Sequence, residues 1–398
     1  MMNNIAARSC ITQAIPWLGL IVLGLAATFG VFSGGAMAAI GIGGAVLLFA
    51  AVWYADGKQP AFYTDILKLF VVIFGAIGLL NLQAVWPAIA WHQTLQLATI
   101  LLPLSLLASL RVQTFIAQTP VLKIWPWLLL AGMLALGVEL ALGNPLQAWL
   151  RGEAVPTKYN RGLSYAMLLI WPVLALLFTS GQRKWAALVA LAALPLLIFT
   201  TSRASQLATM IAVPTLLMAF CIPRVVGWLL GVVVIVMLAW PFAPPQIFAM
   251  RPDWITHLPD SWRARMEIWD FMYYHIMERP WLGWGLGSSW KLLPVSPHAA
   301  QYIITKGPVG HPHNAFIQLW VELGIPGLIL GIALALGSLR AALRLASQLV
   351  PFALAAWVVA FVLSMVAYDF WTDSLLAAFA LTGFAFALVQ RQIKPGFA

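Results

Sequence analysis

Charged residues interrupt the chain so rarely that long apolar segments recur along most of its length. These segments run for about 17 to 22 residues, which is the length that a helix needs to cross a hydrocarbon core of about 30 Å. In hydrocarbon every backbone amide must be paired within its own structure, so only helices or a closed barrel can span it. Barrel strands need only about ten residues. The segments therefore predict an all-α, polytopic membrane protein.

The composition excludes a soluble protein. Hydrophobic residues make up 62% of the chain, charged residues make up 9%, and the mean hydropathy is +0.91. A soluble domain carries about 25% charged residues, so this chain could not cover a water-facing surface. The net charge of +10 comes without the basic soluble domain that a nucleic-acid-binding protein needs. Cys10 and Cys221 both fall on the predicted inner side, so we expect no structural disulfide.

Hydropathy predicts about twelve spans. They are residues 14–32, 35–53, 66–85, 94–110, 122–142, 163–179, 185–200, 204–220, 225–242, 315–336, 350–367 and 374–390. The apolar run 185–220 is too long for one span, and we divide it at the polar step TTSR, residues 200–203. We expect the first span to be retained and not cleaved as a signal peptide, because twelve spans with both termini inside require it.

The distribution of Lys and Arg predicts the orientation of the chain. With the N-terminus inside, the inner side holds twelve of these cations and two acids, which accounts for the whole net charge of +10. The outer loops 31–35 and 86–93 hold none. The inner cations are Arg8, Lys58, Lys68, Arg111, Lys123, Arg183, Lys184, Arg224, Arg340, Arg344, Arg391 and Lys394. Both termini are therefore predicted to lie inside.

The composition changes at one place, residues 243–314, which hold most of the histidines and many Trp, Arg, Asp and Pro residues. We expect three parts: a membrane bundle of nine spans over 1–242, a large extracytoplasmic loop subdomain over 243–314, and three further spans over 315–398. An inverted repeat is not evident, which disfavours a transporter.

Several cations stand where a membrane disfavours them. Lys158 and Arg161 precede the span 163–179 on the outer side, either as solvated, snorkelling cations or as ligands of an anion. An Arg at bilayer depth costs about 2.5–3.5 kcal/mol. Arg203 should therefore face a wet cavity or an anion, unless the helix ends there and the side chain reaches outward. The neighbouring hydroxyl groups and the amides of the following helix favour an anion.

Residues 260–280 of the large loop predict an amphipathic helix that carries Arg265. From spacing alone, an ion pair of Arg265 with Glu267 or Asp270 is the simpler interpretation. The glycines at 283, 285 and 287 permit a tight turn. We favour a structural turn over a phosphate-binding loop, because no strand precedes them.

A polar cluster lies at the mouth of the tenth span. His311 and His313 form an H-x-H pair, but neither cysteines nor regularly spaced carboxylates complete a metal shell, so we expect no metal. A neutral His beside Asn314 and near arginines is better suited to act as a general base. Glu322 lies two turns into the span and should be paired or line a cavity.

These residues place several cations and one candidate base on one side of the membrane. G-x-S-x-G, Walker and D-x-D motifs do not occur in the sequence. Their absence disfavours a serine hydrolase, an ATPase and a metal-dependent sugar-nucleotide transferase. A cationic cavity at a membrane surface suits an amphipathic substrate with a polyanionic head, such as a lipid pyrophosphate.

Two stretches resemble the C-terminal signature of the O-antigen ligase/polymerase superfamily. They are RMEIWDFMYYHIMERPWLGWGLG from residue 265 and HPHNAFIQLWVELGIPGLIL from residue 311. They are similar to the family's Arg-bearing helix, its R-P-x-x-G-x-G-x-G turn, its H-N-x-x-x-Q segment and its E-L-G-x-x-G helix. TSRAS, residues 201–205, is similar to the family's S-R-(G/A) step. The resemblance is strong over 265–330, moderate over 200–210, and limited to hydropathy in the first five spans.

The resemblance implies a GT-C-like lipid-sugar glycosyltransferase with about twelve transmembrane helices and one large periplasmic loop. It implies an enzyme of the bacterial inner membrane that needs neither metal nor cofactor. The catalytic residues it implies are His313 as base and Arg265 and Arg203 as pyrophosphate ligands. The residues it implies for binding the pyrophosphate or the glycan are Arg161, Lys158, Asn314, His311 and Glu322.

The resemblance also implies the reaction. His313 would deprotonate an acceptor hydroxyl, which would displace undecaprenyl pyrophosphate from the glycan in a single, inverting step. As a ligase, the protein would transfer O-antigen to lipid A–core oligosaccharide, which the compact chain favours. The alternatives are an O-antigen polymerase and a protein O-oligosaccharyltransferase. A lipid-linked glycan flippase belongs to another class, and it would need polar residues along both halves of a pathway.

Overall fold

The computed structural model describes residues 2–56, 63–108, 113, 116–117, 120–250, 253–298, 300, 302, 304 and 310–393. In these ranges the regular secondary structure is helical and no β-strand occurs. The predicted all-α class is therefore confirmed for the part of the chain described. The predicted inner cations Lys58, Arg111 and Lys394 lie outside the described residues.

A helix lies at the position of each predicted span. The helices before the large loop are α1 (Met2–Phe32), α2 (Gly34–Asp56), α3 (Tyr63–Asn81), α4 (Pro87–Leu106), α6 (Trp125–Ala141), α7 (Pro145–Arg151), α8 (Asn160–Thr179), α9 (Arg183–Phe199), α10 (Arg203–Cys221) and α11 (Pro223–Leu238). The later helices are α12 (Ala243–Ala249), α13 (Asp260–Glu278), α14 (Ala315–Leu343), α15 (Val350–Val366) and α16 (Asp373–Ile393). Short 3-10 turns lie at Pro120–Lys123, Pro156–Tyr159, Trp240–Phe242, Asp253–His257 and Ser288–Lys291.

Seven helices within the described ranges are long and apolar enough to cross a membrane. Three further apolar helices are shorter, at Phe70–Asn81, Trp125–Ala141 and Val350–Val366. These helices agree with a multi-pass membrane protein. The number of twelve crossings stays a prediction.

The predicted division of the long run 185–220 is present, because α9 ends at Phe199 and α10 begins at Arg203. Thr200 has an extended backbone, and the Ser202 hydroxyl accepts a hydrogen bond from the amide of Ser205 at 3.4 Å. Such a cap satisfies one of the amides that lack a partner at a helix start. The polar step therefore ends one helix and begins the next.

α8 lies at the centre of the bundle. All its residues from Gly162 to Leu177 are buried, as expected of a helix that is apolar on every side. α1, α6, α9, α15 and α16 pack around it. Near its start α8 approaches α1 so closely that a Cβ added at Gly162 would lie 1.7 Å from the carbonyl oxygen of Val31.

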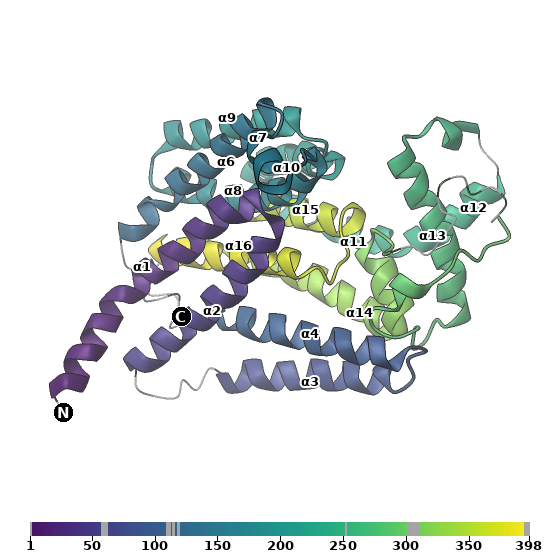
Figure 1. Ribbon diagram of the computed structural model, residues 1–398, viewed down its shortest axis with the longest axis horizontal. Coiled ribbons are helices and arrows are strands. Elements are labelled where there is room, and N and C mark those ends of the chain that lie inside the picture. Colours follow the sequence, from purple (N-terminus) through teal and green to yellow (C-terminus); the bar gives the residue numbers. More distant parts are fainter. Residues whose placement is uncertain are drawn as a thin grey trace.

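α12 and α13 form a lobe beside the bundle, on the right in Figure 1. Phe248 of α12, Phe271 of α13 and Tyr302 are buried in a hydrophobic core of the lobe. Ile317 and Val321 of α14 belong to the same core, so the first turns of α14 join the lobe to the bundle. The lobe corresponds to the predicted segment 243–314, and its place outside the membrane stays a prediction.

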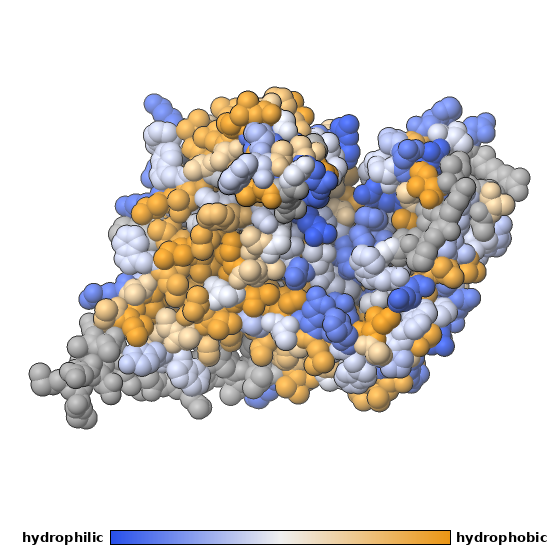
Figure 2. Space-filling model, viewed as in Figure 1, coloured by the Kyte–Doolittle hydropathy of each residue, from blue (hydrophilic) through white to orange (hydrophobic). Residues whose placement is uncertain are grey.

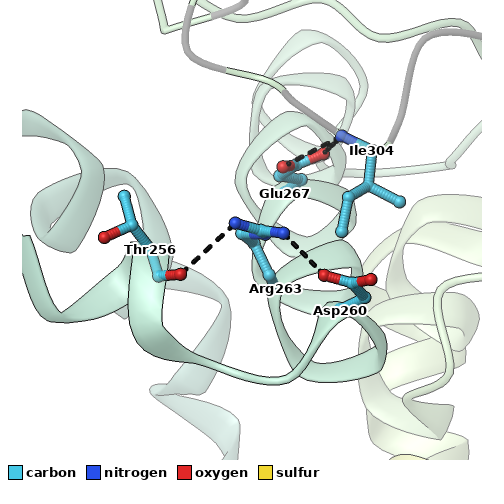
Figure 3. A network of polar contacts seen from close by, with 5 residues as sticks. All are labelled: Thr256, Asp260, Arg263, Glu267 and Ile304. Carbon is cyan, nitrogen blue, oxygen red and sulfur yellow. Dashed lines mark hydrogen bonds and ion pairs between the residues drawn. The ribbon is translucent and has the colours of Figure 1, made fainter.

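Polar contacts fasten the first turns of α13 to neighbouring loops (Figure 3). Arg263 donates to the Asp260 carboxylate at 2.6 Å and to the Thr256 carbonyl at 3.4 Å. One turn later, the buried carboxylate of Glu267 accepts a hydrogen bond from the Ile304 amide at 3.1 Å. The contacts with Thr256 and Ile304 join the first turns of α13 to neighbouring segments of the lobe.

On the face shown in Figure 2, much of the bundle surface is apolar, whereas hydrophilic residues gather around the hollow between the bundle and the lobe. Leu79, Ile198 and Trp228 are examples of large apolar side chains that are mostly exposed. Exposed apolar surface of this extent is a liability in water but matches contact with lipid chains. The hollow is therefore the part of this face that suits a polar substrate.

We predict that Gly162→Ala destabilises the protein by at least ~3 kcal/mol, the upper part of the usual cost of overpacking. The new Cβ would meet a backbone oxygen that cannot turn away. Thermal unfolding in detergent, followed by helical circular dichroism, measures the effect. Gly43→Ala is the control, since an added Cβ at Gly43 meets nothing within 4 Å. Equal unfolding temperatures for the two variants would contradict the close packing of α1 on α8.

Candidate active site

Two successive carbonyl groups at the end of α15 hold the two most informative polar side chains. The Val366 carbonyl accepts a hydrogen bond from Arg265 Nε at 3.0 Å, and the Ala367 carbonyl accepts one from His313 Nδ1 at 3.0 Å. Arg265 comes from α13 and His313 from the turn before α14, so three segments far apart in sequence meet here. The structure thus brings together the predicted base and one predicted pyrophosphate ligand.

His313 has an unusual backbone conformation, with a φ of +52° in the left-handed region. Its neighbours hold it there. Trp269 Nε1 donates to the Pro312 carbonyl at 2.7 Å, and the Asn314 side chain caps α14 by accepting from the Ile317 amide at 3.1 Å. Such strain costs about 1–3 kcal/mol and persists where the surroundings fix it, often at active sites.

The hydrogen bond of His313 determines which ring nitrogen carries the proton. A carbonyl oxygen only accepts, so Nδ1 bears the hydrogen and Nε2 keeps its lone pair. Burial, followed by the charges of His311 and Arg265, lowers the pKa of His313 to about 3. Burial, followed by the charges of Arg265 and Arg161, lowers the pKa of His311 to about 4. Both rings, with centroids 3.9 Å apart, are therefore neutral near pH 7.

Arg265 has no carboxylate partner among the described residues. Its guanidinium lies over the ring of Trp262, 5.7 Å from the centroid, and donates to the Ser261 carbonyl. Burial lowers the pKa of Arg265. A partly buried guanidinium without a carboxylate is suited to bind an anion.

The ion pair that spacing alone favours for Arg265 does not form. The Glu267 carboxylate accepts from the Ile304 amide. The Asp270 carboxylate accepts from the hydroxyl groups of Ser296 and Tyr302, each at 2.6 Å. The two acids therefore organise the loop of the lobe, and Arg265 stays available.

Arg161, in the first turn of α8, lies toward the two histidines. Its charge contributes to the lowered pKa of His311. The preceding residue, Asn160, accepts with its carbonyl a hydrogen bond from the Tyr368 hydroxyl at 3.2 Å. Tyr368 directly follows the carbonyl that holds His313. Lys158 lies nearby in sequence but forms an exposed ion pair with Glu153.

The segment that carries Arg203 packs on the same turn of α8. The hydroxyl groups of Thr200 and Thr201 donate to the Asn160 side-chain carbonyl at 3.2 and 3.1 Å. The hydroxyl of Ser205 lies 2.8 Å from that of Ser164. The guanidinium of Arg203 itself is exposed and donates to Gln206 at 3.0 Å. Its segment thus lies beside Asn160, while no contact with Arg265 or the histidines occurs among the described residues.

Glu322 is fully buried, and its carboxylate is surrounded by donors. The Gly287 amide, the Ser289 hydroxyl and Trp371 Nε1 donate to it at 2.8, 2.6 and 2.7 Å, and Gln318 Nε2 donates at 3.2 Å. These bonds join α14 to the glycine turn and to the α15–α16 loop. Substrate binding by Glu322 stays a prediction, but the geometry favours a structural role.

The glycine turn packs its backbone against a break in α14. Gly283, Gly285 and Gly287 all have positive φ. The amides of Trp284 and Gly285 donate to the carbonyls of Val321 and Glu322 at 2.9 and 2.8 Å. These contacts agree with the predicted structural turn and not with a phosphate loop.

The α15–α16 loop is the part of the site that sequence reasoning missed. Besides its two carbonyls, it contains Asp369, which accepts from Gln318 Nε2 at 2.7 Å and from Trp290 Nε1 at 2.9 Å. The Phe370 amide donates to the Gln318 side chain at 3.0 Å. The polar residues of YDFWTD, 368–373, between two apolar spans were the available signal.

We predict that Glu322→Gln destabilises the protein by ~3 kcal/mol, because an amide would direct its own N–H groups at donors that the carboxylate satisfies. The unfolding temperature in detergent measures the change. Glu278→Gln is the control, since that side chain is half exposed. A variant as stable as the control would show that the four donors do not depend on the negative charge.

We predict that lowering the pH from 7 to 5 destabilises the fold through His311 and His313. The unfolded chain protonates a histidine near pH 6.5, whereas the folded chain does so only near pH 4 and pH 3. Below pH 6.5 the unfolded state therefore binds more protons, which costs about 2 kcal/mol per histidine at pH 5. The measurement compares unfolding at both pH values for the wild type and for the double variant His311→Gln, His313→Gln.

The double variant should lose less stability than the wild type over this pH range. His257→Gln, at an exposed histidine, serves as the control and should behave like the wild type. An unchanged pH dependence in the double variant would contradict the neutral state of the two rings.

Part of the chain is similar to known proteins. Residues 186–332 match the family model described as "O-Antigen ligase". A "Putative polysaccharide ligase" of Rickettsia felis is 26% identical over 219 residues, which cover 53% of this chain and 53% of that protein. A relative of the same description in Rickettsia typhi is 29% identical over 184 residues, 44% of each chain. The chain spans about half the length of the curated relatives it matches.

The matched region runs from α9 into α14 and contains Arg203, Arg265 and His313. Arg161 and the α15–α16 loop lie outside it.

Proposed function

We propose that the chain is a membrane glycosyltransferase of the O-antigen ligase type, which transfers O-antigen glycan from undecaprenyl pyrophosphate to lipid A–core oligosaccharide. The match of residues 186–332 to the O-antigen ligase family model supports this proposal. The observation that carries the proposal is the pairing of Arg265 and His313 on adjacent carbonyls. This places a guanidinium that has no carboxylate partner among the described residues near a neutral imidazole, which suits an anionic leaving group beside a base.

The proposed location is a bacterial inner membrane, with both termini in the cytoplasm and the site at the periplasmic face. The inner excess of Lys and Arg supports this orientation. With twelve crossings, residues 243–314 would lie on the periplasmic side, where lipid-linked glycan and lipid A–core would meet.

In the proposed reaction, His313 Nε2 accepts the proton of an acceptor sugar hydroxyl as its oxygen attacks the anomeric carbon of the donor. The bond from that carbon to the pyrophosphate oxygen breaks on the opposite face, so the configuration inverts. The electron pair leaves with the pyrophosphate. A base that is positioned in this way contributes about 10²–10⁴-fold to the rate.

Arg265 would stabilise the charge that develops on the departing pyrophosphate. Charged groups that are already oriented act strongly in a site with little water, and loss of one such group costs about 10²–10³-fold in rate. Arg161 and Arg203 would add positive charge from the starts of α8 and α10. With this charge the proposed reaction needs no metal.

His311, Lys158 and Asn314 are proposed to help bind the pyrophosphate or the glycan. His311 lies against His313 and Trp290 and so forms one wall of the site. Asn314 acts at least through its cap of α14. Lys158 would have to exchange its ion pair with Glu153 for the substrate.

We predict that purified protein transfers glycan from undecaprenyl pyrophosphate to lipid A–core in the presence of EDTA. His313→Ala should reduce the rate by ~10²–10⁴-fold, and Arg265→Ala by ~10²–10³-fold. Arg265→Lys should recover part of the loss, because it restores the charge but not the planar group. The conversion of lipid A–core to a larger species on a gel measures transfer.

Four outcomes would change the assignment. Full activity of His313→Ala removes that residue as the base, and loss of transfer in EDTA argues for a metal. Elongation of the lipid-linked glycan without lipid A–core identifies a polymerase. Transport of the glycan across vesicles without transfer identifies a flippase.

A further inference from the structure

A cavity of about 990 Å³ lies where α1, α2, α6 and α7 meet the start of α8. Its walls are mainly apolar. Among the residues that line it are Phe29, Phe32, Ala135, Leu146 and Leu150. Phe29 and Leu150 are each 64% exposed, so these walls are open to an occupant. A cavity with such walls suits a hydrocarbon chain.

Two cations line the cavity close together in sequence: Lys158 in the 3-10 turn before α8 and Arg161 in the first turn of α8. Lys158 is paired with Glu153, but Arg161 has no carboxylate partner among the described residues. A pocket that is apolar along its walls and cationic at the α8 start matches an anionic lipid. The head of the lipid would lie at Arg161.

The same cationic end adjoins the candidate active site. Asn160, next to Arg161, contacts the Tyr368 hydroxyl through its carbonyl. Tyr368 follows Ala367, whose carbonyl holds His313. The charge of Arg161 also contributes to the lowered pKa of His311. An anionic head at Arg161 would therefore lie toward Arg265 and His313.

We infer that this cavity holds the isoprenoid units nearest the pyrophosphate of the lipid-linked donor, with Arg161 at the junction of chain and head. The identity of the ligand rests on the proposed function. In this donor the hydrocarbon chain is bonded directly to the pyrophosphate, so chain and reacting head must lie side by side. In lipid A–core the acyl chains are separated from the acceptor hydroxyl by the core sugars, so they do not need a cavity here.

Gly35 in the first turn of α2 allows the cavity to be filled without disturbing its walls. It lines the cavity, is exposed, and an added Cβ would meet nothing within 4 Å. Gly43, two turns later on the same helix, is also exposed with room for a Cβ, but does not line the cavity. Gly35→Phe and Gly43→Phe are therefore a matched pair. Ala135→Phe fills the cavity from α6.

The test measures binding of radiolabelled undecaprenyl pyrophosphate without glycan to the full chain in phosphatidylcholine nanodiscs. Gly35→Phe and Ala135→Phe should each weaken binding at least tenfold, while Gly43→Phe stays within twofold of the wild type. Inorganic pyrophosphate, used as a competitor, should show the same affinity in all these variants, which also reports an intact head site. Arg161→Ala should weaken the binding of both probes.

Wild-type affinity of the two filled variants would overturn the inference. Displacement of the probe by a tenfold excess of phosphatidylglycerol would also overturn it, since the cavity would then be a general lipid site. The assay contains no acceptor, so it separates the two proposals. If Gly35→Phe weakens binding but the wild type does not transfer glycan to lipid A–core, the inference stands and the proposed function is wrong. If the wild type transfers glycan but Gly35→Phe binds the probe normally, the proposed function stands and the inference is wrong.

Discussion

The last carbonyl groups of a helix have no partner within the helix and carry part of its negative dipole. At the end of α15 these groups belong to Val366 and Ala367, and two side chains from other elements satisfy them. Arg265 gains a favourable place for its charge, and His313 gains a fixed tautomer. The arrangement of the site thus depends on where α15 stops.

The end of α15 is itself held by buried polar contacts. Gln318 donates to both Asp369 and Glu322 and accepts from the Phe370 amide, so it joins α14 to the loop through its whole amide group. Glu322 extends the link to the glycine turn that follows α13. Buried acceptors that are fully satisfied give a single geometry, because any change leaves a group without a partner. The helix that carries Arg265 and the turn that carries His313 are therefore set by one network.

The sequence predicted the helices well because each apolar run is long and bounded by polar residues. It even predicted the break between α9 and α10, because the apolar run 185–220 is too long for one span; the structure adds that Ser202 caps α10. It did not predict the part of the site that uses backbone carbonyls, because a carbonyl has no signal in the sequence. Spacing also favoured an ion pair for Arg265 that the fold replaces, since Glu267 and Asp270 bind the loop of the lobe. The sequence thus indicated candidate side chains for the site, but not the groups that each of them contacts across the fold.

In the proposed mechanism, the low pKa of His313 has a consequence for the order of events. A base with a pKa of about 3 removes protons poorly at neutral pH. Burial is the largest cause, followed by the charges of His311 and Arg265, so a bound pyrophosphate that neutralises the charge of Arg265 would raise the pKa of His313 in part. The bound donor would then make His313 a stronger base. Before the donor binds, a hydroxyl group or a water beside His313 would stay protonated, which links activation of the acceptor to the presence of the leaving group.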